Sequence, residues 1–104
     1  MSYIMVKHII LWQLKDELSD NEKVNVKLGI KEGLESLMGK IEGLIEIKVE
    51  TEGLASSNAD VMLYSVFEDE NSLKSYATHP AHVEVADTKV RPFTKTRLCL
   101  DFEC

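Results

Sequence analysis

The sequence predicts an α+β domain in which a four-stranded antiparallel sheet carries helices on one face, in the order β-α-β-β-α-β. Four segments alternate in side-chain character with the period of a strand, and the segments between them repeat apolar residues with the period of a helix. Recognisable caps mark where the helices begin. The length of 104 residues, without linkers, repeats or low-complexity segments, predicts one domain over residues 1–104.

The first predicted strand covers residues 3–14 and is apolar on both faces. His8 and Trp12 share one face with four aliphatic residues, while the opposite face combines apolar residues with Lys7 and Gln13. A strand with one face in water would alternate cleanly between apolar and polar residues. We therefore expect this strand to be central in the sheet and covered on both sides.

The first helix is predicted to begin at residues 19–22, Ser-Asp-Asn-Glu, which have the form of a capping box. Apolar residues then recur at helical spacing, and the helix is expected to run to about Gly39. Gly29 and Gly33 lie inside it, where each costs up to about 1 kcal/mol relative to alanine. We expect these glycines to permit close packing against the sheet.

The next two strands are predicted at residues 44–52 and 60–67, joined by a small polar loop at 53–58. In the segment 44–52, isoleucine and valine alternate with glutamate and lysine, so one face of that strand is wet. The segment 60–67 is apolar on both sides. It is therefore expected to be central, like the first strand.

Two short helices and a last strand complete the order. Asp69 is placed to cap a helix, which Pro80 interrupts because a residue before proline avoids the α region. Pro80 fits the first position of a further short helix, for which His79 is the expected cap. Residues 93–102 then form the fourth strand.

This order is the ferredoxin-like arrangement, in which the helices cover one face of the sheet. The strands at 3–14 and 60–67 would then leave a large apolar patch on the uncovered face, and such patches mark interaction surfaces. A second copy packing sheet against sheet would cover the patch. We therefore expect a homodimer that buries more than about 1,200 Å² in total.

Charge and composition exclude several classes of partner. The net charge of −6 argues against nucleic acid and against an anionic membrane surface. No apolar run approaches the ~20 residues of a membrane-spanning helix, and the first residues lack the features of a signal peptide, so we expect a cytoplasmic protein. Cys99 and Cys104 would lie about 16 Å apart along a strand, which predicts free thiols because a disulfide needs about 7 Å.

Three stretches resemble the stress-responsive A/B-barrel (Dabb) family: residues 5–12 (Met-Val-Lys-His-Ile-Ile-Leu-Trp), residues 76–83 (Tyr-Ala-Thr-His-Pro-Ala-His-Val), and residues 90–92 (Val-Arg-Pro) leading to 101–103 (Asp-Phe-Glu). The resemblance covers nearly the whole chain, and the His-Pro-Ala-His segment is its most specific part. It implies two ferredoxin-like sheets packed as a dimeric α+β barrel. Some similar proteins are polyketide cyclases, and similar barrels host cofactor-independent monooxygenases.

The candidate site combines a phenol and imidazoles from separate elements. Pro80 turns the chain so that Tyr76 and His82 converge, with His8, on one apolar space where they can polarise a carbonyl and move a proton. The resemblance to cyclising relatives implies Tyr76 as carbonyl donor and His82 as general base. Where those relatives carry further polar groups, this chain has Ile30 and Val61, which puts the orientation of a substrate in doubt.

Each of these residues also has a structural interpretation. His8 fits a core histidine bonded to a backbone carbonyl or a tyrosine, and His82 fits a helix-stabilising residue. The pair His79 and His82 lacks the carboxylate or thiolate partners of a zinc site, so we expect no metal and no cofactor. Arg91 is expected to form a structural ion pair.

The resulting expectation is binding of a small hydrophobic or aromatic molecule between sheet and helices. The alternatives are a cofactor-free polyketide-cyclase-like lyase, a cofactor-independent monooxygenase, or a purely structural stress-protective oligomer. An open cavity lined by the candidate residues favours binding or catalysis, whereas a filled core around His8 favours the structural alternative. Beside Tyr76 and His82, the expected lining consists of His8, Trp12, Ile30, Val61 and His79.

Overall fold

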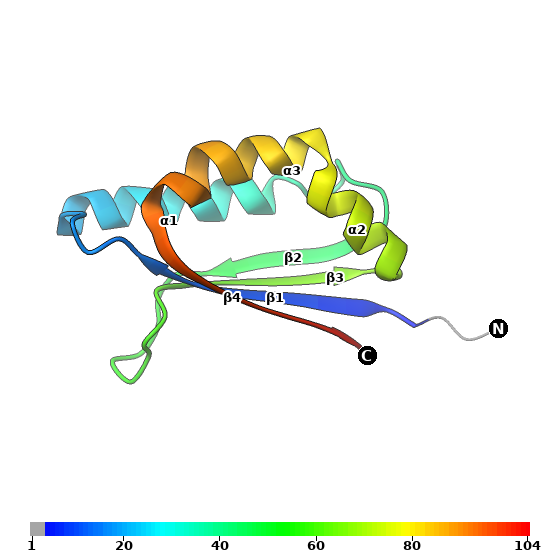
Figure 1. The fold of residues 1–104 in the computed structure, drawn as a ribbon, viewed down its shortest axis with the longest axis horizontal. Coiled ribbons are helices and arrows are strands. Elements are labelled where there is room, and N and C mark those ends of the chain that lie inside the picture. Colours follow the sequence, from blue (N-terminus) through cyan, green and yellow to red (C-terminus); the bar gives the residue numbers. More distant parts are fainter. Residues whose placement is uncertain (1–3) are drawn as a thin grey trace.

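A computed structural model describes residues 4–104 and confirms the ferredoxin-like α+β fold (Figure 1). Tyr3, the first residue of the strand predicted at 3–14, lies outside the described residues. The elements are, in order, β1 (Val6–Leu14), α1 (Asp20–Glu35), β2 (Leu44–Glu50), β3 (Val61–Phe67), α2 (Glu70–Thr78), α3 (Pro80–Val85), the π-helical turn η1 (Ala86–Val90), the 3₁₀ turn η2 (Arg91–Phe93) and β4 (Thr94–Glu103).

The sheet has the strand order β2-β3-β1-β4, and all neighbouring strands are antiparallel. The central positions of β1 and β3 confirm what their two apolar faces predicted. All of the helices lie on one side of the sheet (Figure 1). The other side, which we call the open face, is uncovered in the single chain.

The core lies between the sheet and the helices. Alternate residues of β1 from Val6 to Leu14 are buried there, and α1 contributes Val26, Ile30 and Leu34. Burying a side chain of this size stabilises the fold by roughly 1.5–3 kcal/mol. Within residues 4–104, the buried polar residues are His8, which is 8% exposed, and Ser65, which is 0% exposed. These two residues pair across the strands, and the Ser65 hydroxyl donates a hydrogen bond of 2.9 Å to the His8 carbonyl.

The capping box predicted for α1 is present. The Ser19 hydroxyl accepts from the Glu22 amide at 3.2 Å, and the Glu22 carboxylate accepts from the Ser19 amide at 3.0 Å. The helix ends at Glu35, four residues before the predicted end at Gly39, because residues 36–40 form turns that finish with Gly39 at a φ of +83°. This left-handed conformation favours glycine and cannot continue a helix.

The expectation that the glycines of α1 pack against the sheet is wrong. A Cβ on Gly33 would lie 2.9 Å from Cγ1 of Val85 in α3, and one on Gly29 would lie 3.7 Å from Cδ of Lys89 in η1. The glycines therefore let α1 approach the neighbouring helical segment. The larger side chains of α1, such as Ile30, face the sheet instead.

Side-chain caps also fix the two short helices. The Asp69 carboxylate accepts from the Ser72 amide at 2.7 Å and begins α2. The His79 imidazole accepts from the Ala81 amide at 3.1 Å through Nδ1, and Pro80 is the first residue of α3. Both caps and the break at Pro80 confirm the sequence prediction. Together they set the angle at which α2 and α3 pass over the sheet.

The open face is apolar over β1 and β4 and charged over β2. Ile9 pairs with Leu100, and Leu11 pairs with Leu98, which places these four side chains together. Leu98 and Leu100 are each 63% exposed, and the nearby Phe102 is 40% exposed. None of the helices within residues 4–104 is long and apolar enough to cross a membrane.

Candidate functional site

Two neighbouring cavities lie between the sheet and the helices, and His8 and Arg97 line both of them. The inner cavity has a volume of about 90 Å³ and lies toward α3 and η1. The outer groove has a volume of about 670 Å³ and lies toward α2 and the end of β4. The inner cavity is lined by His8, Ile10, Trp12, Leu34, Leu63, His82, Ala86, Val90, Arg91, Thr94 and Arg97. The outer groove is lined by Ile4, Val6, His8, Asp69, Glu70, Leu73, Lys74, Ala77, Arg97, Cys99, Asp101, Phe102 and Glu103.

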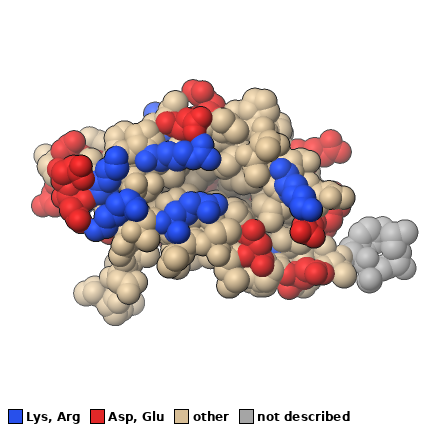
Figure 2. All heavy atoms as spheres, in the orientation of Figure 1, with Lys and Arg blue, Asp and Glu red and all other residues tan. Residues whose placement is uncertain are grey.

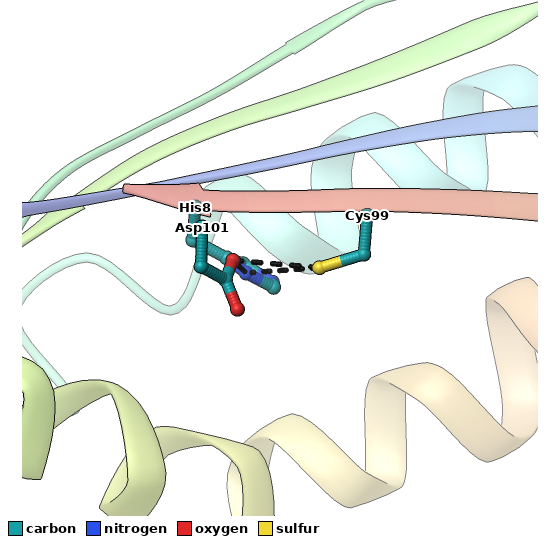
Figure 3. A group of neighbouring side chains, drawn as sticks. All are labelled: His8, Cys99 and Asp101. Carbon is teal, nitrogen blue, oxygen red and sulfur yellow. Dashed lines mark hydrogen bonds and ion pairs between the residues drawn. The ribbon is translucent and has the colours of Figure 1, made fainter. Parts of the chain in front are cut away.

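His8 is held by a carboxylate from the neighbouring strand. Strand pairing places His8 opposite Asp101, and His8 Nδ1 hydrogen-bonds to Asp101 Oδ1. Figure 3 shows the side chains of His8, Cys99 and Asp101 projecting together toward the helices. Because a carboxylate accepts, Nδ1 carries the hydrogen, and Nε2 of a neutral His8 is left as a base or acceptor. The expected partners of His8, a carbonyl or a tyrosine, are therefore wrong.

Tyr76 lies at the centre of an aromatic cluster and is only 1% exposed. Its ring centroid lies 4.9 Å from that of Phe67, 6.1 Å from that of His8 and 4.2 Å from that of His82. The Tyr76 hydroxyl is buried and has no hydrogen-bond partner within residues 4–104. Burial raises the pKa of Tyr76 above its ordinary value, which keeps the phenol protonated.

The predicted convergence of Tyr76 and His82 is therefore present, but Tyr76 lines neither cavity. Its ring packs edge-on against Phe67 in the core. Sequence spacing across Pro80 could predict that the two rings approach each other. It could not predict how deeply each ring is buried, because depth depends on packing against β3.

His82 is half-buried and faces the inner cavity. Its Nδ1 lies 3.2 Å from the Ala77 carbonyl, to which it donates, so Nε2 of the neutral ring is free to accept a proton. Burial lowers the pKa of His82, and the positive charges of Arg91 and Arg97 lower it further, against the opposing effect of the Ala77 hydrogen bond. His82 is therefore mostly neutral at pH 7, as a general base requires.

The other predicted lining residues divide into two groups. Trp12 lines the inner cavity, as predicted. Ile30 and Val61 are core residues with 0% and 2% exposure, and His79 directs Nδ1 at the first turn of α3 as its cap. None of these last three lines the cavities beside His8, because side-chain packing and capping hold them elsewhere. The prediction that these three residues line the pocket is therefore wrong.

Three residues of β4 reach the site without having been predicted: Arg97, Cys99 and Asp101. They alternate along the strand and so share the face that looks toward the helices. Their alternate spacing in the sequence is the signal that places them on one face, but the apolar residues between them, Leu98 and Leu100, are the stronger pattern. Arg91 forms its predicted structural ion pair, with Asp87 one helical turn away.

Within residues 4–104, the one group of three possible metal ligands is His8, Cys99 and Asp101, whose ligand atoms lie within 4.8 Å of one another. Burial raises the pKa of the Cys99 thiol, and the Asp101 carboxylate raises it further. The three side chains are linked by hydrogen bonds, because Asp101 Oδ1 accepts from His8 and, at 3.4 Å, from the Cys99 thiol. Cys99 and Cys104 are free thiols, in agreement with the prediction.

Comparisons with known proteins identify the family. None of the curated proteins matches the chain. A dimeric protein of unknown function and ferredoxin-like fold from Bacteroides fragilis is 35% identical, with a TM-score of 0.90 and 96% of each chain covered.

Two more distant structures share the fold. A dimeric ferredoxin-like protein of unknown function from Thermobifida fusca is 20% identical, with a TM-score of 0.79 and coverage of 100% of this chain and 94% of that one. A hydroxynitrile lyase from Passiflora edulis is 16% identical, with a TM-score of 0.74 and coverage of 99% and 95%. The family model described as "Stress responsive A/B Barrel Domain" matches residues 6–104. The chain therefore belongs to the stress-responsive A/B barrel (Dabb) family.

Proposed function

We propose that the chain binds a small hydrophobic or aromatic molecule between the sheet and helices α2 and α3. The observation that carries the proposal is the buried, unpartnered hydroxyl of Tyr76 beside His8 and His82. A buried polar group without a partner costs about 1–3 kcal/mol, and a phenylalanine would fill the same space without that cost. The hydroxyl is accounted for if the ligand supplies its partner.

The surroundings of Tyr76 fit such a ligand. The inner cavity is walled by apolar side chains, among them Trp12, and polar groups are confined to a few positions, as in most small-molecule sites. The hydroxyl is closed off in this structure, so a ligand reaches it after a small displacement of the covering side chains. The His82 ring packs against the Tyr76 ring, with 4.2 Å between centroids, and lines the inner cavity, so we propose that it is a side chain that moves.

We predict that Tyr76→Phe separates stability from binding. Without ligand, the variant is expected to be more stable by about 1 kcal/mol, because the uncompensated burial of a hydroxyl is removed. For a domain of this size, that raises the melting temperature by about 4–8 °C. Aromatic and fatty acids that stabilise the wild-type chain in a thermal-shift screen are expected to stabilise the variant less.

His82→Ala serves as the comparison in the same screen. Apolar burial supplies most of the binding energy, so this variant should retain ligand stabilisation. If no compound raises the melting temperature of the wild-type chain, binding is contradicted and the structural-oligomer alternative is supported. A loss of stability in Tyr76→Phe would show that the hydroxyl has a structural partner.

We further propose that the chain functions as a homodimer joined through the open face. The support is the group of exposed apolar side chains shared by β1 and β4, including Leu98 and Leu100. The similar protein from Bacteroides fragilis is itself described as dimeric. A second copy would bury these side chains and leave the two cavities, which face the helices, accessible.

A second candidate function is a cofactor-free lyase that works by acid–base chemistry on a carbonyl compound. The observation in its favour is the neutral His82, which presents Nε2 to the inner cavity because Nδ1 is bonded to the Ala77 carbonyl. A base of this kind would remove a proton from a substrate, with the phenol of Tyr76 as donor to the carbonyl oxygen. A hydroxynitrile lyase from Passiflora edulis has the same fold, which supports this proposal.

The lyase proposal predicts that the His82 imidazole titrates below its ordinary pKa of 6.5 in the folded chain. Its folded pKa is lowered, so the contribution of His82 to stability is present above pH 6.5 and is lost as the pH falls through the folded pKa. Histidine NMR signals followed from pH 8 to pH 5, with His82→Gln for assignment, measure this value. A midpoint at or above 6.5 would remove the basis for His82 as the base.

A further inference from the structure

We propose that the inner cavity receives the anionic group of the ligand, a carboxylate, and that Arg97 recognises it. This inference rests on the proposed ligand binding and specifies the chemistry of the ligand. The ligand class is then an aromatic or aliphatic acid with an apolar body, rather than a neutral aromatic compound.

The ionisable side chains that line the inner cavity are all basic. Although the chain has a net charge of −6, its only two arginines, Arg91 and Arg97, both line this cavity. They are joined by the imidazoles of His8 and His82, and no Asp or Glu belongs to the lining. Figure 2 shows Lys and Arg side chains on both sides of a hollow in this face of the molecule.

The outer groove has the opposite character. Four carboxylates line it, those of Asp69, Glu70, Asp101 and Glu103, against two cations, Lys74 and Arg97. An anion entering from the outer groove is therefore repelled there and attracted toward the inner cavity. This difference in charge between the outer groove and the inner cavity orients an amphipathic acid with its carboxylate in the inner cavity.

Arg97 is the available cation at the junction of the two spaces. Arg91 is engaged by the carboxylate of Asp87, whereas no carboxylate within residues 4–104 forms a salt bridge with Arg97. Arg97 lies opposite Trp12 in the pairing of β4 with β1, on the side of the sheet that faces the helices. A guanidinium in this position can bind both oxygens of a carboxylate through two parallel N–H donors.

The buried phenol of Tyr76 supplies a second, independent observation that points to an acceptor. Its hydroxyl is unpartnered within the described residues, and its ring packs against His82, which lines the inner cavity together with Arg97. A carboxylate held by Arg97 has two oxygens with several lone pairs. One oxygen could therefore also accept from Tyr76 once the covering side chains move.

The size of the inner cavity agrees with this assignment. A volume of about 90 Å³ admits a carboxylate with a short apolar extension. The rest of an apolar ligand would extend past His8 and Arg97, which both spaces share, toward apolar residues such as Leu73 in the outer groove. Trp12 and Ile10 offer apolar contacts on the inner side.

Benzoate and benzamide test the proposal because they have nearly the same shape and differ in charge. NMR titration of the wild-type chain at low ionic strength should show benzoate binding about tenfold more tightly than benzamide, a modest ratio because Arg97 is partly in solvent. Arg97→Gln should reduce the ratio to about one, and Arg97→Lys should retain part of it. Lys40→Gln, which removes an exposed cation that lines neither cavity, should leave the ratio unchanged.

The outcomes distinguish a failure of carboxylate recognition by Arg97 from a failure of ligand binding as a whole. Equal binding of benzoate and benzamide, or an unchanged ratio in Arg97→Gln, would overturn anion recognition and leave binding of aromatic molecules standing. A failure of both compounds, together with every compound of the thermal-shift screen, would contradict binding itself. Melting curves of the variants confirm that each one is folded before its titration is interpreted.

Discussion

The variant Leu100→Asp is expected to sediment as a monomer at micromolar concentration, and the wild-type chain is expected to sediment at twice the 11.8 kDa of a single chain. Leu100 lies at the middle of the apolar part of the open face. It pairs with Ile9 on β1 and lies between Leu98 and Phe102 along β4. A carboxylate there would have to lose its hydration on association without gaining a partner. The cost of several kcal/mol is enough to dissociate an ordinary interface.

Val24→Asp is the matched control for this prediction. Val24 is 64% exposed and Leu100 is 63% exposed, but Val24 lies on α1, on the opposite side of the sheet from the open face. The control variant should remain dimeric. A wild-type chain of 11.8 kDa in solution, or a Leu100→Asp variant that remains dimeric, would contradict the homodimer proposal.

The fold could be predicted from sequence because its signals are local. The capping box at Ser19, the cap at Asp69 and the break at Pro80 each act within four residues of chain. The central positions of β1 and β3 followed from apolar residues on both of their faces, a pattern that only a doubly covered strand needs. Such signals do not depend on which distant residues become neighbours.

The site was less predictable because its key contacts join opposite ends of the chain. The pair His8–Asp101 depends on the register between β1 and β4, and a slip of one residue would turn Asp101 to the open face. Register is fixed by packing of the whole sheet, so the partner of His8 could not be assigned from its neighbours in sequence. The glycines of α1 illustrate the same point. Their spacing indicated that another element packs closely on α1, but it could not identify that element as α3.

Gly43→Ala is expected to destabilise the chain by about 2–5 kcal/mol, since two costs add at this position. Gly43 joins α1 to β2 with a φ of +87°, a left-handed conformation that alanine adopts at a cost of about 1–2 kcal/mol. A Cβ added there would also lie 2.5 Å from Cβ of Ser72 and closer still to its hydroxyl. Ser72 is in the first turn of α2, so relief requires that helix to move, and overpacking of this kind typically costs 1–3 kcal/mol.

Gly39→Ala distinguishes the two costs. Gly39 has nearly the same conformation, with a φ of +83°, but a Cβ there would have no atom within 4 Å. Thermal unfolding should therefore show a loss of about 1 kcal/mol for Gly39→Ala, from backbone strain alone. The loss for Gly43→Ala should be at least twice as large, a fall in melting temperature of about 8 °C or more.

The difference between the stability losses of Gly43→Ala and Gly39→Ala measures how firmly α2 is held against the β2 end of the sheet. That helix carries Asp69, Leu73 and Lys74 of the outer groove together with Tyr76, so a shift of α2 would also alter the proposed binding site. Equal losses for Gly43→Ala and Gly39→Ala would mean that α2 yields without resistance. The outer groove would then have no rigid wall on that side, and the shape argued for the ligand would lose its physical basis.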